Sequence, residues 1–460
     1  MLKNSLNRKS YVNLACYLTL VIFFWIIMLP IIHAEDNLIT VQGDTFSDKM
    51  AWLNVFGQSN TNYILEINSD ERITSQSFVY SGKTNINITI KGIGGSRNIR
   101  LSEPRDRITV GSGITLVFDD NVNVIGRGSL PNSAGNGGVV YVETGGTFIM
   151  NEGSNISQGN IEGYGHGVYV HGGSFIMNGG QIYGKRGYGV FLRDGSFTMD
   201  SGIIRGNSSG GVTSQFGNPS FTMNGGSILN NNGAGVHLRA GAFVMNAGEI
   251  SNNSNTTRST TPTHGGGVIV INNNVRFTMH GGTISGNTAN FGGGVSISHG
   301  GEFILNDGYI FGNNAVITVH GVVRPFGGSG GGVHGGFQMN GGNITGNIAH
   351  RVGGGVFVEG RVNMLNGTIS SNTSRENGGG VYVNSGTFTK TGGILTGFTD
   401  NSSDGNVVKD SSGNVLNFRG HAAYAGSADT VLKIKEKSAG QEENLFFNTS
   451  GNQFNGEWDN

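Results

Sequence analysis

The chain of 460 residues is poor in the residues that define several common protein classes. It has 1 cysteine and 6 prolines, and only 13% of its residues are charged. A single cysteine cannot form a disulfide within the chain, and so few prolines exclude a collagen-like triple helix. The formal net charge of -1 excludes a global positive field for nucleic acid. Stability therefore has to come from packing and from backbone hydrogen bonds.

The first 34 residues are typical of a secretory signal peptide. Three cations, Lys3, Arg8 and Lys9, precede a nearly continuous apolar run over 17–29, and Ala34 offers a small residue at the cleavage position. An uncleaved anchor is the alternative, because residues 14–32 almost reach the length of a membrane span. Cleavage removes three cations and no acids, so the net charge falls from -1 to about -4. We expect a secreted or cell-surface protein with no membrane span in the mature chain.

The chain contains 82 glycines, and one glycine-rich repeat unit recurs from about residue 137 to about residue 400. It reads Gly-Gly-Val-x-Val, a glycine-containing turn, Phe-x-Met-Asn-Gly-Gly, and then x-Ile-x-x-Asn. The lead aromatic position holds Phe148, Phe175, Phe197, Phe221, Phe243, Phe277, Phe303, Phe337 and Phe388, with Val362 in its place once. Met usually follows two residues later and Ile seven residues later. Such a fixed repeat is the signature of a solenoid.

The alternation within the unit predicts strands and no helices. Residues at i and i+2 share one face of a strand, so each unit holds three short strands separated by Gly or Asn turns. A minimal unit of 22 residues, the spacing of Phe175 and Phe197, suits one coil of a three-sided, right-handed parallel β-helix. We predict an all-β fold of roughly 15 coils, about 70 Å long at ~4.8 Å per coil.

Asparagine follows two of the three predicted strands in most units. We interpret these residues as structural corners, because Asn tolerates the left-handed conformation and stacked amides can hydrogen-bond from coil to coil. The positions after the Phe strand are Asn151, Asn178, Asn224, Asn246, Asn306 and Asn340, and those after the Ile strand are Asn207, Asn231, Asn253, Asn287, Asn313, Asn347 and Asn372.

The sequence divides into four segments. Residues 1–34 are the signal peptide, 35–136 an N-terminal cap with irregular first coils, 137–400 the regular repeats, and 401–460 a C-terminal cap and tail. Within the second segment, residues 44–53 predict a short capped helix with Phe46, Met50 and Leu53 on one side. Such a helix would cover the open end of the solenoid.

Two repeats carry insertions at the same corner, between the Ile strand and the next Gly-Gly-Val. They span 254–263 and 315–328, and the second contains His320, Arg324 and Phe326. Insertions on one face of a solenoid often mark a binding side, so we take these three residues as candidate ligand contacts. Neutral variation in a tolerant loop is the alternative.

A second candidate binding surface is the outward corner after the Val strand. Arg193 and Arg239 occupy equivalent positions two coils apart, with Gln215 between them. Their predicted separation is about 9.6 Å, which suits a basic strip for acidic glycans. Ordinary solvated charge is the alternative interpretation.

Parallel β-helices often act on polysaccharides, and hydrolysis of a glycosidic bond needs two well-placed carboxylates. Asp119 and Asp120 precede His166, in Gly-His-Gly, by about two coils, and this set is faintly similar to the acids and histidine of pectin-degrading hydrolases. The Asn-Thr-Asp and Arg-Ile-Lys segments expected beside them are absent. A polysaccharide lyase or glycoside hydrolase therefore remains the enzymatic alternative, and we predict neither a metal site nor a cofactor.

The pairing of Gly-Gly-Val with Phe-x-x-Asn resembles the repeats of the polymorphic outer-membrane adhesins of chlamydiae. The resemblance covers about 137–395 and rests on pairs such as Phe148/Asn151 and Phe221/Asn224. It implies a β-helical passenger that binds host cells. We therefore expect a non-catalytic adhesin or binding protein that contacts a host surface or glycan through its outward corners and inserted loops. A purely structural surface component is the third alternative.

Overall fold

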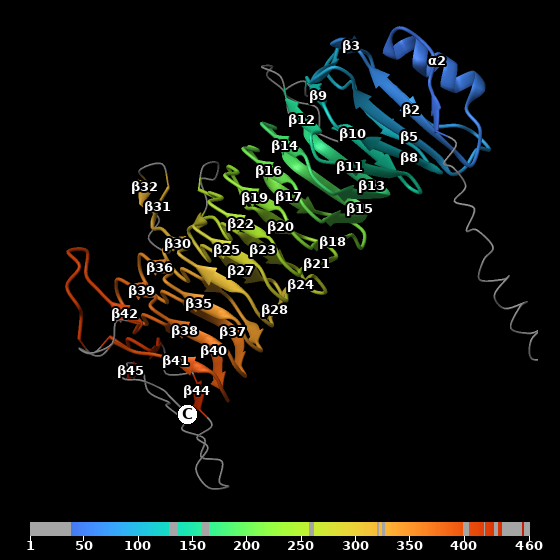
Figure 1. The fold of residues 1–460 in the computed structure, drawn as a ribbon. Coiled ribbons are helices and arrows are strands. Elements are labelled where there is room, and N and C mark those ends of the chain that lie inside the picture. The colour runs from blue at the N-terminus through green and yellow to red at the C-terminus, as the bar shows by residue number, and fades with distance from the viewer. Residues whose placement is uncertain are drawn as a thin grey trace, which may run out of the picture.

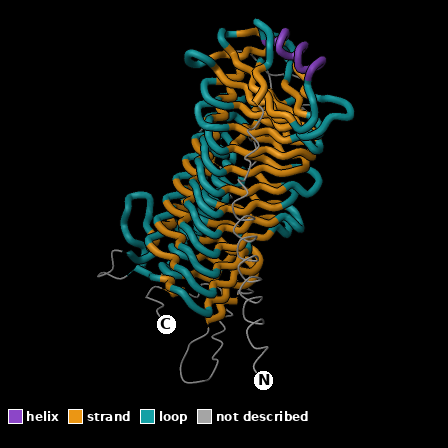
Figure 2. Tube along the Cα trace, turned by 45° about the vertical axis from the view of Figure 1, so that its right-hand side comes forward, coloured by secondary structure: helices purple, strands orange, loops and turns teal. Residues whose placement is uncertain are grey.

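The computed structural model describes residues 38–127, 137–158, 165–256, 262–319, 322–323, 327–398, 404–417, 419–426, 431–434 and 453–454. The predicted signal peptide, with Cys16, lies outside these ranges. The described chain forms a parallel β-solenoid with one α-helix at its N-terminal end (Figures 1 and 2). The predicted all-β parallel β-helix is therefore confirmed.

Each coil contributes strands to rows that run the length of the solenoid. The Phe row consists of β1 (Leu38–Thr40), β2 (Thr61–Ile67), β5 (Ile86–Gly92), β8 (Ile114–Phe118), β11 (Thr147–Met150), β13 (His166–Met177), β15 (Tyr188–Met199), β18 (Ser220–Met223), β21 (Ala242–Met245), β24 (Arg276–Met279), β28 (Glu302–Leu305), β34 (Phe337–Met339), β37 (Val356–Met364), β40 (Val381–Lys390) and β44 (Val431–Ile434). The Val row shares the long strands β13, β15, β37 and β40 and adds β4 (Gln76–Phe78), β7 (Ile108–Val110), β10 (Gly138–Glu143), β17 (Gly210–Ser214), β20 (Val236–Leu238), β23 (Val268–Ile271), β27 (Val295–Ser298), β33 (Val333–His334) and β43 (Ala423–Ala425). These two rows together form one 25-stranded sheet, whose last strand, β45 (Gln453–Phe454), pairs antiparallel with β43.

The third side of the solenoid is a separate sheet of 13 strands. This Ile row consists of β3 (Glu71–Ile73), β6 (Arg97–Leu101), β9 (Val122–Gly126), β12 (Asn155–Gln158), β14 (Gln181–Tyr183), β16 (Ile203–Arg205), β19 (Ser227–Leu229), β22 (Glu249–Ser251), β25 (Thr283–Ser285), β29 (Tyr309–Phe311), β35 (Asn343–Thr345), β38 (Thr368–Ser370) and β41 (Ile394–Leu395). Its 13 strands leave 12 intervals, which gives about 58 Å at ~4.8 Å each. In the described residues, the predicted number of roughly 15 coils equals the 15 strands of the Phe row and exceeds the 13 strands of the Ile row.

A short fourth row, which the sequence pattern did not single out, closes the later coils. It consists of β26 (Thr288–Ala289), β30 (Asn314–Ala315), β36 (Ile348–Ala349), β39 (Thr373–Ser374) and β42 (Val407–Val408). Small inward side chains line it, since Ala289, Ala315 and Ala349 are fully buried. Beside it, β31 (Thr318–Val319) and β32 (Val322–Val323) form an antiparallel hairpin within the second insertion.

The core is a set of apolar columns along the solenoid axis. The rings of Phe175, Phe197 and Phe221 stack with centroid separations of 4.7 and 4.8 Å and interplanar angles of 5°. The stack continues through Phe243 and Phe277 at 4.5 and 4.7 Å. These spacings match the distance between paired strands, so the register of the sheet places each ring directly on the next. The predicted aromatic column is confirmed.

A second column, fully buried, consists of the asparagines that follow the Ile row. In Asn253, for example, the side-chain Nδ2 donates to Asn287 Oδ1 at 3.0 Å and to Ile228 O at 2.9 Å, and the backbone N–H donates to the same Oδ1 at 2.9 Å. The members are Asn207, Asn231, Asn253, Asn287, Asn313, Asn347, Asn372 and Asn406, all at most 1% exposed. The structural interpretation of these residues is confirmed.

The reason given for asparagine at these corners was wrong in one respect. The left-handed conformation belongs to the residue before the buried asparagine, such as Asn230 (φ 54°) before Asn231 or Gly286 (φ 63°) before Asn287. The buried asparagines themselves are absent from the positive-φ residues of the described chain. Their amides are selected for hydrogen bonding across coils, while the preceding residue makes the turn.

The N-terminal end is covered by helix α2 (Phe46–Phe56), as predicted. Thr45 is the N-cap, and its side chain and Asp48 form a capping box. Phe46, Met50 and Leu53 face inward and are at most 5% exposed. The helix thus shields the first coils from water, as a solenoid end requires.

Candidate ligand-binding corner

The turn that joins each Val-row strand to the following Phe-row strand forms a continuous edge, which we call the outer corner. It comprises residues 144–146, 171–173, 193–195, 215–219, 239–241, 272–275, 299–301, 335–336, 359–361 and 384–386. Backbones approach closely here: a Cβ on Gly195 (φ 88°) would lie 2.2 Å from Gly173 O. The tight backbone stack fixes the positions of the side chains that project from this edge.

Arg193, Gln215 and Arg239 project from consecutive coils of the outer corner, as predicted. Their neighbours are in register, because Leu192 pairs with Ser214 and Ser214 with Leu238. Both arginines are exposed and Gln215 is half-buried. The Arg193 guanidinium lies 5.7 Å from the Phe216 ring centroid. The structure thus brings the predicted basic strip together, and its role in binding stays a prediction.

The two inserted loops precede Val-row strands, whereas the outer corner follows them. Ser254 pairs with Thr288 of the fourth row, and Ser329 pairs with Phe291, so both insertions leave the solenoid before a Gly-Gly-Val segment. His320, Arg324 and Phe326 lie outside the described residues. The two surfaces predicted from the sequence are therefore different edges of the solenoid.

Asp119 and Asp120 are not brought together with His166. Both aspartates directly follow β8, at the C-terminal end of a Phe-row strand. His166 is the first residue of β13, at the N-terminal end of a Val-row strand. Met177, which shares a column with Phe118, lies 11 residues after His166, or about 36 Å of extended chain. Spacing along the sequence could not reveal this, because it does not say on which side of a coil a residue lies.

Each member of this set instead has a local structural partner. The carboxylates of Asp119 and Asp120 lie 3.7 and 3.8 Å from Lys91 Nζ, and Asp119 accepts a hydrogen bond from Asn151 Nδ2. His166 Nδ1 accepts from the backbone N–H of Tyr188 at 3.1 Å. Asp119 thus belongs to the exposed asparagine column after the Phe row, which continues from Asn151 to Asn178.

Lys185, which precedes Arg193 by eight residues in the sequence, is 1% exposed. Its Nζ donates to Ser157 O at 2.5 Å, and burial holds the pKa of the ammonium well below its ordinary value. It therefore adds no charge to the surface of the outer corner.

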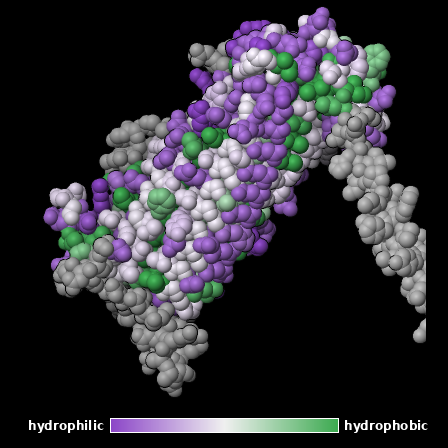
Figure 3. Space-filling view, in the orientation of Figure 1, coloured by the Kyte–Doolittle hydropathy of each residue, from purple (hydrophilic) through white to green (hydrophobic). Residues whose placement is uncertain are grey.

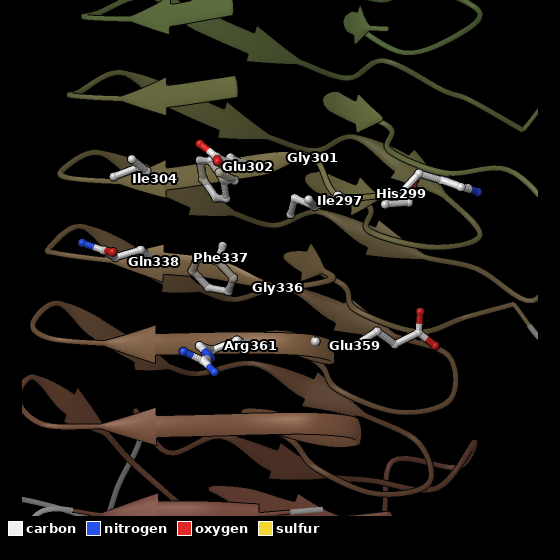
Figure 4. Close-up of a pocket in the computed structure, with 14 residues that line it drawn as sticks. Ile297, His299, Gly301, Glu302, Ile304, Gly336, Phe337, Gln338, Glu359 and Arg361 are labelled. Carbon is white, nitrogen blue, oxygen red and sulfur yellow. The ribbon is translucent and has the colours of Figure 1, made fainter. Parts of the chain in front are cut away.

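A cavity of about 750 Å³ opens at the outer corner farther along the solenoid, and we call it the notch. Its lining comes from three neighbouring coils: Ile297, Ser298, His299, Gly300, Gly301, Glu302, Phe303, Ile304, Gly336, Phe337, Gln338, Glu359, Gly360 and Arg361. In Figure 4, Gly336 lies between Glu302 on one neighbouring coil and Arg361 on the other. The notch exists because the middle coil turns on Gly335 and Gly336, which project no side chains.

A buried histidine lies in β33, two residues before Gly336. His334 is 4% exposed, its ring stacks on Phe357 at 4.9 Å, and its Nε2 lies 3.9 Å from Glu359 Oε2. Within the described residues, its Nδ1 has no hydrogen-bond partner. Burial, aided by the nearby His264, lowers the pKa of His334 to about 3.

The notch does not have the geometry of a glycoside hydrolase. Its carboxylates, Glu302 and Glu359, point away from each other in Figure 4, whereas such enzymes oppose two carboxylates across one bond. A serine–histidine contact lies nearby, since Ser296 Oγ is 3.3 Å from His264 Nδ1. Ser296 is fully buried, so a substrate could not reach this hydroxyl.

The surface around the outer corner is polar. On the face drawn in Figure 3, hydrophilic side chains form a band along the flank of β18, β21, β24 and β28. Over the ranges that the structure describes, no cluster of three or more His, Cys, Asp or Glu residues could hold a metal ion. In that same part of the chain, no helix combines the length and the apolar character needed to cross a membrane.

The notch was missed at the sequence level, although the repeats contain its signal. The residue before the lead aromatic is Arg276, Glu302, Gly336 and Arg361 in four successive coils, so alignment by coil shows a missing side chain within a charged column. Comparison with protein-family models, curated proteins and solved structures gave no match for this chain.

Proposed function

We propose that this chain is a secreted or cell-surface, non-catalytic β-helical binding protein, an adhesin, that contacts glycan or host ligands through its outer corner. The observation that carries the proposal is the coincidence of two features on one edge: the strip of Arg193, Gln215 and Arg239, and the notch. Polar and charged side chains fixed on a rigid scaffold are the usual composition of a recognition surface.

Two further observations support the proposal. The signal-like segment 1–34 favours export, and the Phe-x-x-Asn repeats resemble those of the chlamydial polymorphic outer-membrane adhesins. The enzymatic alternative has less support, because Asp119 and Asp120 lie on a different side of the solenoid from His166. A binding role asks only for exposed groups in fixed positions, which the outer corner provides.

Binding of the purified full chain to host cells and to an array of acidic and neutral glycans tests the proposal. Replacement of Arg193, Gln215 and Arg239 by alanine should weaken binding at least tenfold, because exposed guanidinium groups dominate recognition of acidic ligands. A matched control replaces Arg375, an exposed residue beside the insertion corner, by alanine. Deletion of 254–263 and 315–328 measures the contribution of the inserted loops. Unchanged binding by the triple variant would exclude the strip, and absence of any ligand would leave the structural-component alternative.

A further inference from the structure

We propose that the notch binds a uronic acid residue of an acidic glycan, with the Arg361 guanidinium donating hydrogen bonds to the sugar carboxylate. The carboxylate would occupy the part of the notch that lies beside Gly336 and Arg361. This inference rests on the proposed function of the outer corner and adds a ligand class and a contact residue to it.

The solenoid itself provides a template for the interaction. Arg276 and Glu302 pair in register on adjacent coils, and Glu302 Oε2 accepts from Arg276 Nε and Nη2, each at 2.8 Å. An arginine at this column position therefore reaches a carboxylate at the same position of the next coil. Charge-assisted contacts of this kind are the strong hydrogen bonds of protein surfaces.

Arg361 occupies the same column but lacks such a partner. Leu305 pairs with Met339, and Met339 with Met364, so Glu302, Gly336 and Arg361 follow one another on successive coils. Arg361 is exposed, and no carboxylate of the described residues forms an ion pair with it. The next coil after Arg361 places Thr387 at this column position and the preceding coil places Gly336 there, so neither neighbour supplies a carboxylate.

The backbone holds the position beside Arg361 open. A Cβ on Gly336 would lie 2.8 Å from Arg361 O and 3.0 Å from Arg361 N. A Cβ on Gly335, where φ is 114°, would lie 2.4 Å from Ile297 O. The coils therefore pack too closely for side chains at either residue, so the notch is a fixed feature of the backbone.

The size and the walls of the notch suit a sugar. Its volume of about 750 Å³ falls within the ~300–1,000 Å³ of small-ligand sites. Ile304 is half-buried and offers apolar surface, while Ser298 and Gln338 are half-buried and offer polar groups. A hexose ring has both an apolar face and hydroxyl groups, so one sugar can contact all of these side chains.

The two acidic residues of the notch limit where the ligand carboxylate can lie. Glu302 is paired with Arg276, and Glu359 accepts from Asn384 Nδ2 at 3.2 Å and lies near His334. The ligand carboxylate must avoid both and approach Arg361. Removing the charge of Arg361 and removing the charge of Glu302 should therefore change affinity in opposite directions.

Calorimetric titration of the full chain with trigalacturonate tests the inference. The controls are trigalacturonate methyl ester, which keeps the sugar and loses the charge, and a hexapeptide of glutamate. We expect the methyl ester to bind at least tenfold more weakly. Arg361→Gln should weaken trigalacturonate binding about tenfold, Glu302→Gln should strengthen it, and Arg375→Gln should leave it unchanged. All three side chains are exposed, so circular dichroism and thermal midpoints should match the parent protein.

Several outcomes would overturn the inference: no binding of trigalacturonate, equal binding of the methyl ester, tighter binding of the peptide, or an unchanged affinity in Arg361→Gln. The proposed function fails separately. If the cell and glycan assays show binding that depends on Arg193, Gln215 and Arg239, then the outer corner remains a recognition surface even when the notch has no uronate affinity.

Discussion

Replacement of one buried asparagine tests what holds the coils together. In Asn287→Ala, the side chain removed is the acceptor for two donors of the preceding coil, the backbone N–H of Asn253 at 2.9 Å and its Nδ2 at 3.0 Å. It is also a donor, because Asn287 Nδ2 donates to Ile250 O at 2.8 Å and to Asn313 Oδ1 at 3.0 Å. Asn287 is 0% exposed, so water cannot replace these contacts.

The expected loss of stability follows from the two orphaned donors. Each buried polar group left without a partner costs about 1–3 kcal/mol, so Asn287→Ala should lower the free energy of unfolding by about 2–6 kcal/mol. Asn246→Ala is the matched control, because Asn246 Nδ2 donates to Asn224 Oδ1 at 2.8 Å in the exposed column. Water can solvate the groups freed there, so the control should lose less than about 1 kcal/mol.

Urea denaturation of both variants and of the parent protein measures the difference, with the midpoint and the slope fitted separately. Hydrogen exchange adds local information, since a solenoid is stabilised by contacts between neighbouring repeats. Exchange should rise around Asn253 and Asn313 and much less in distant coils. A loss in Asn287→Ala no larger than that in Asn246→Ala would refute the argument that the buried column, rather than strand pairing alone, binds the coils.

Three further predictions concern the cap, the aromatic core and the response to acid. Thr45→Ala removes the N-cap of α2 and should cost about 1 kcal/mol, measured as an earlier urea midpoint; no shift would show that the cap is dispensable. Phe221→Ala interrupts a stack with neighbours at 4.8 and 4.5 Å and should cost about 3–5 kcal/mol, so a loss below about 1 kcal/mol would contradict the continuous core. Because burial lowers the pKa of His334 from 6.5 to about 3, the unfolded chain binds a proton first as pH falls. The contribution of neutral His334 to the free energy of unfolding is therefore fully present above pH 6.5. Between pH 6.5 and about pH 3 that free energy falls by up to ~1.4 kcal/mol per pH unit. His334→Phe, which can still stack on Phe357, should reduce that acid sensitivity in unfolding curves from pH 7 to pH 4; an unchanged slope would contradict the assignment.

Most of the fold could be predicted from the repeat. The spacing of Phe175 and Phe197 fixed the coil length, and the alternation of Phe and Met fixed which side chains point inward, because strand geometry has a period of two. The helix over 46–56 was predictable from Thr45 and from three apolar residues on one side. The fourth row was not, because two-residue strands such as Thr288–Ala289 have no periodic signature.

The candidate site was predicted only in part. Arg193, Gln215 and Arg239 were placed correctly as neighbours because they hold the same position in consecutive repeats. Asp119 and His166 occupy different positions in the repeat, and only the course of the chain around each coil shows that they lie on different sides.

The sequence by itself therefore determined the coil and its inward columns, since each of these depends on residues close together in the chain. Only the tertiary structure showed that the strip of Arg193, Gln215 and Arg239 lies on the same outer corner as the notch. The notch depends on Glu302, Gly336 and Arg361 lying on stacked backbones, and on a packing distance too short for a Cβ at Gly336. Contacts between coils set that distance, and no local pattern of residues encodes it.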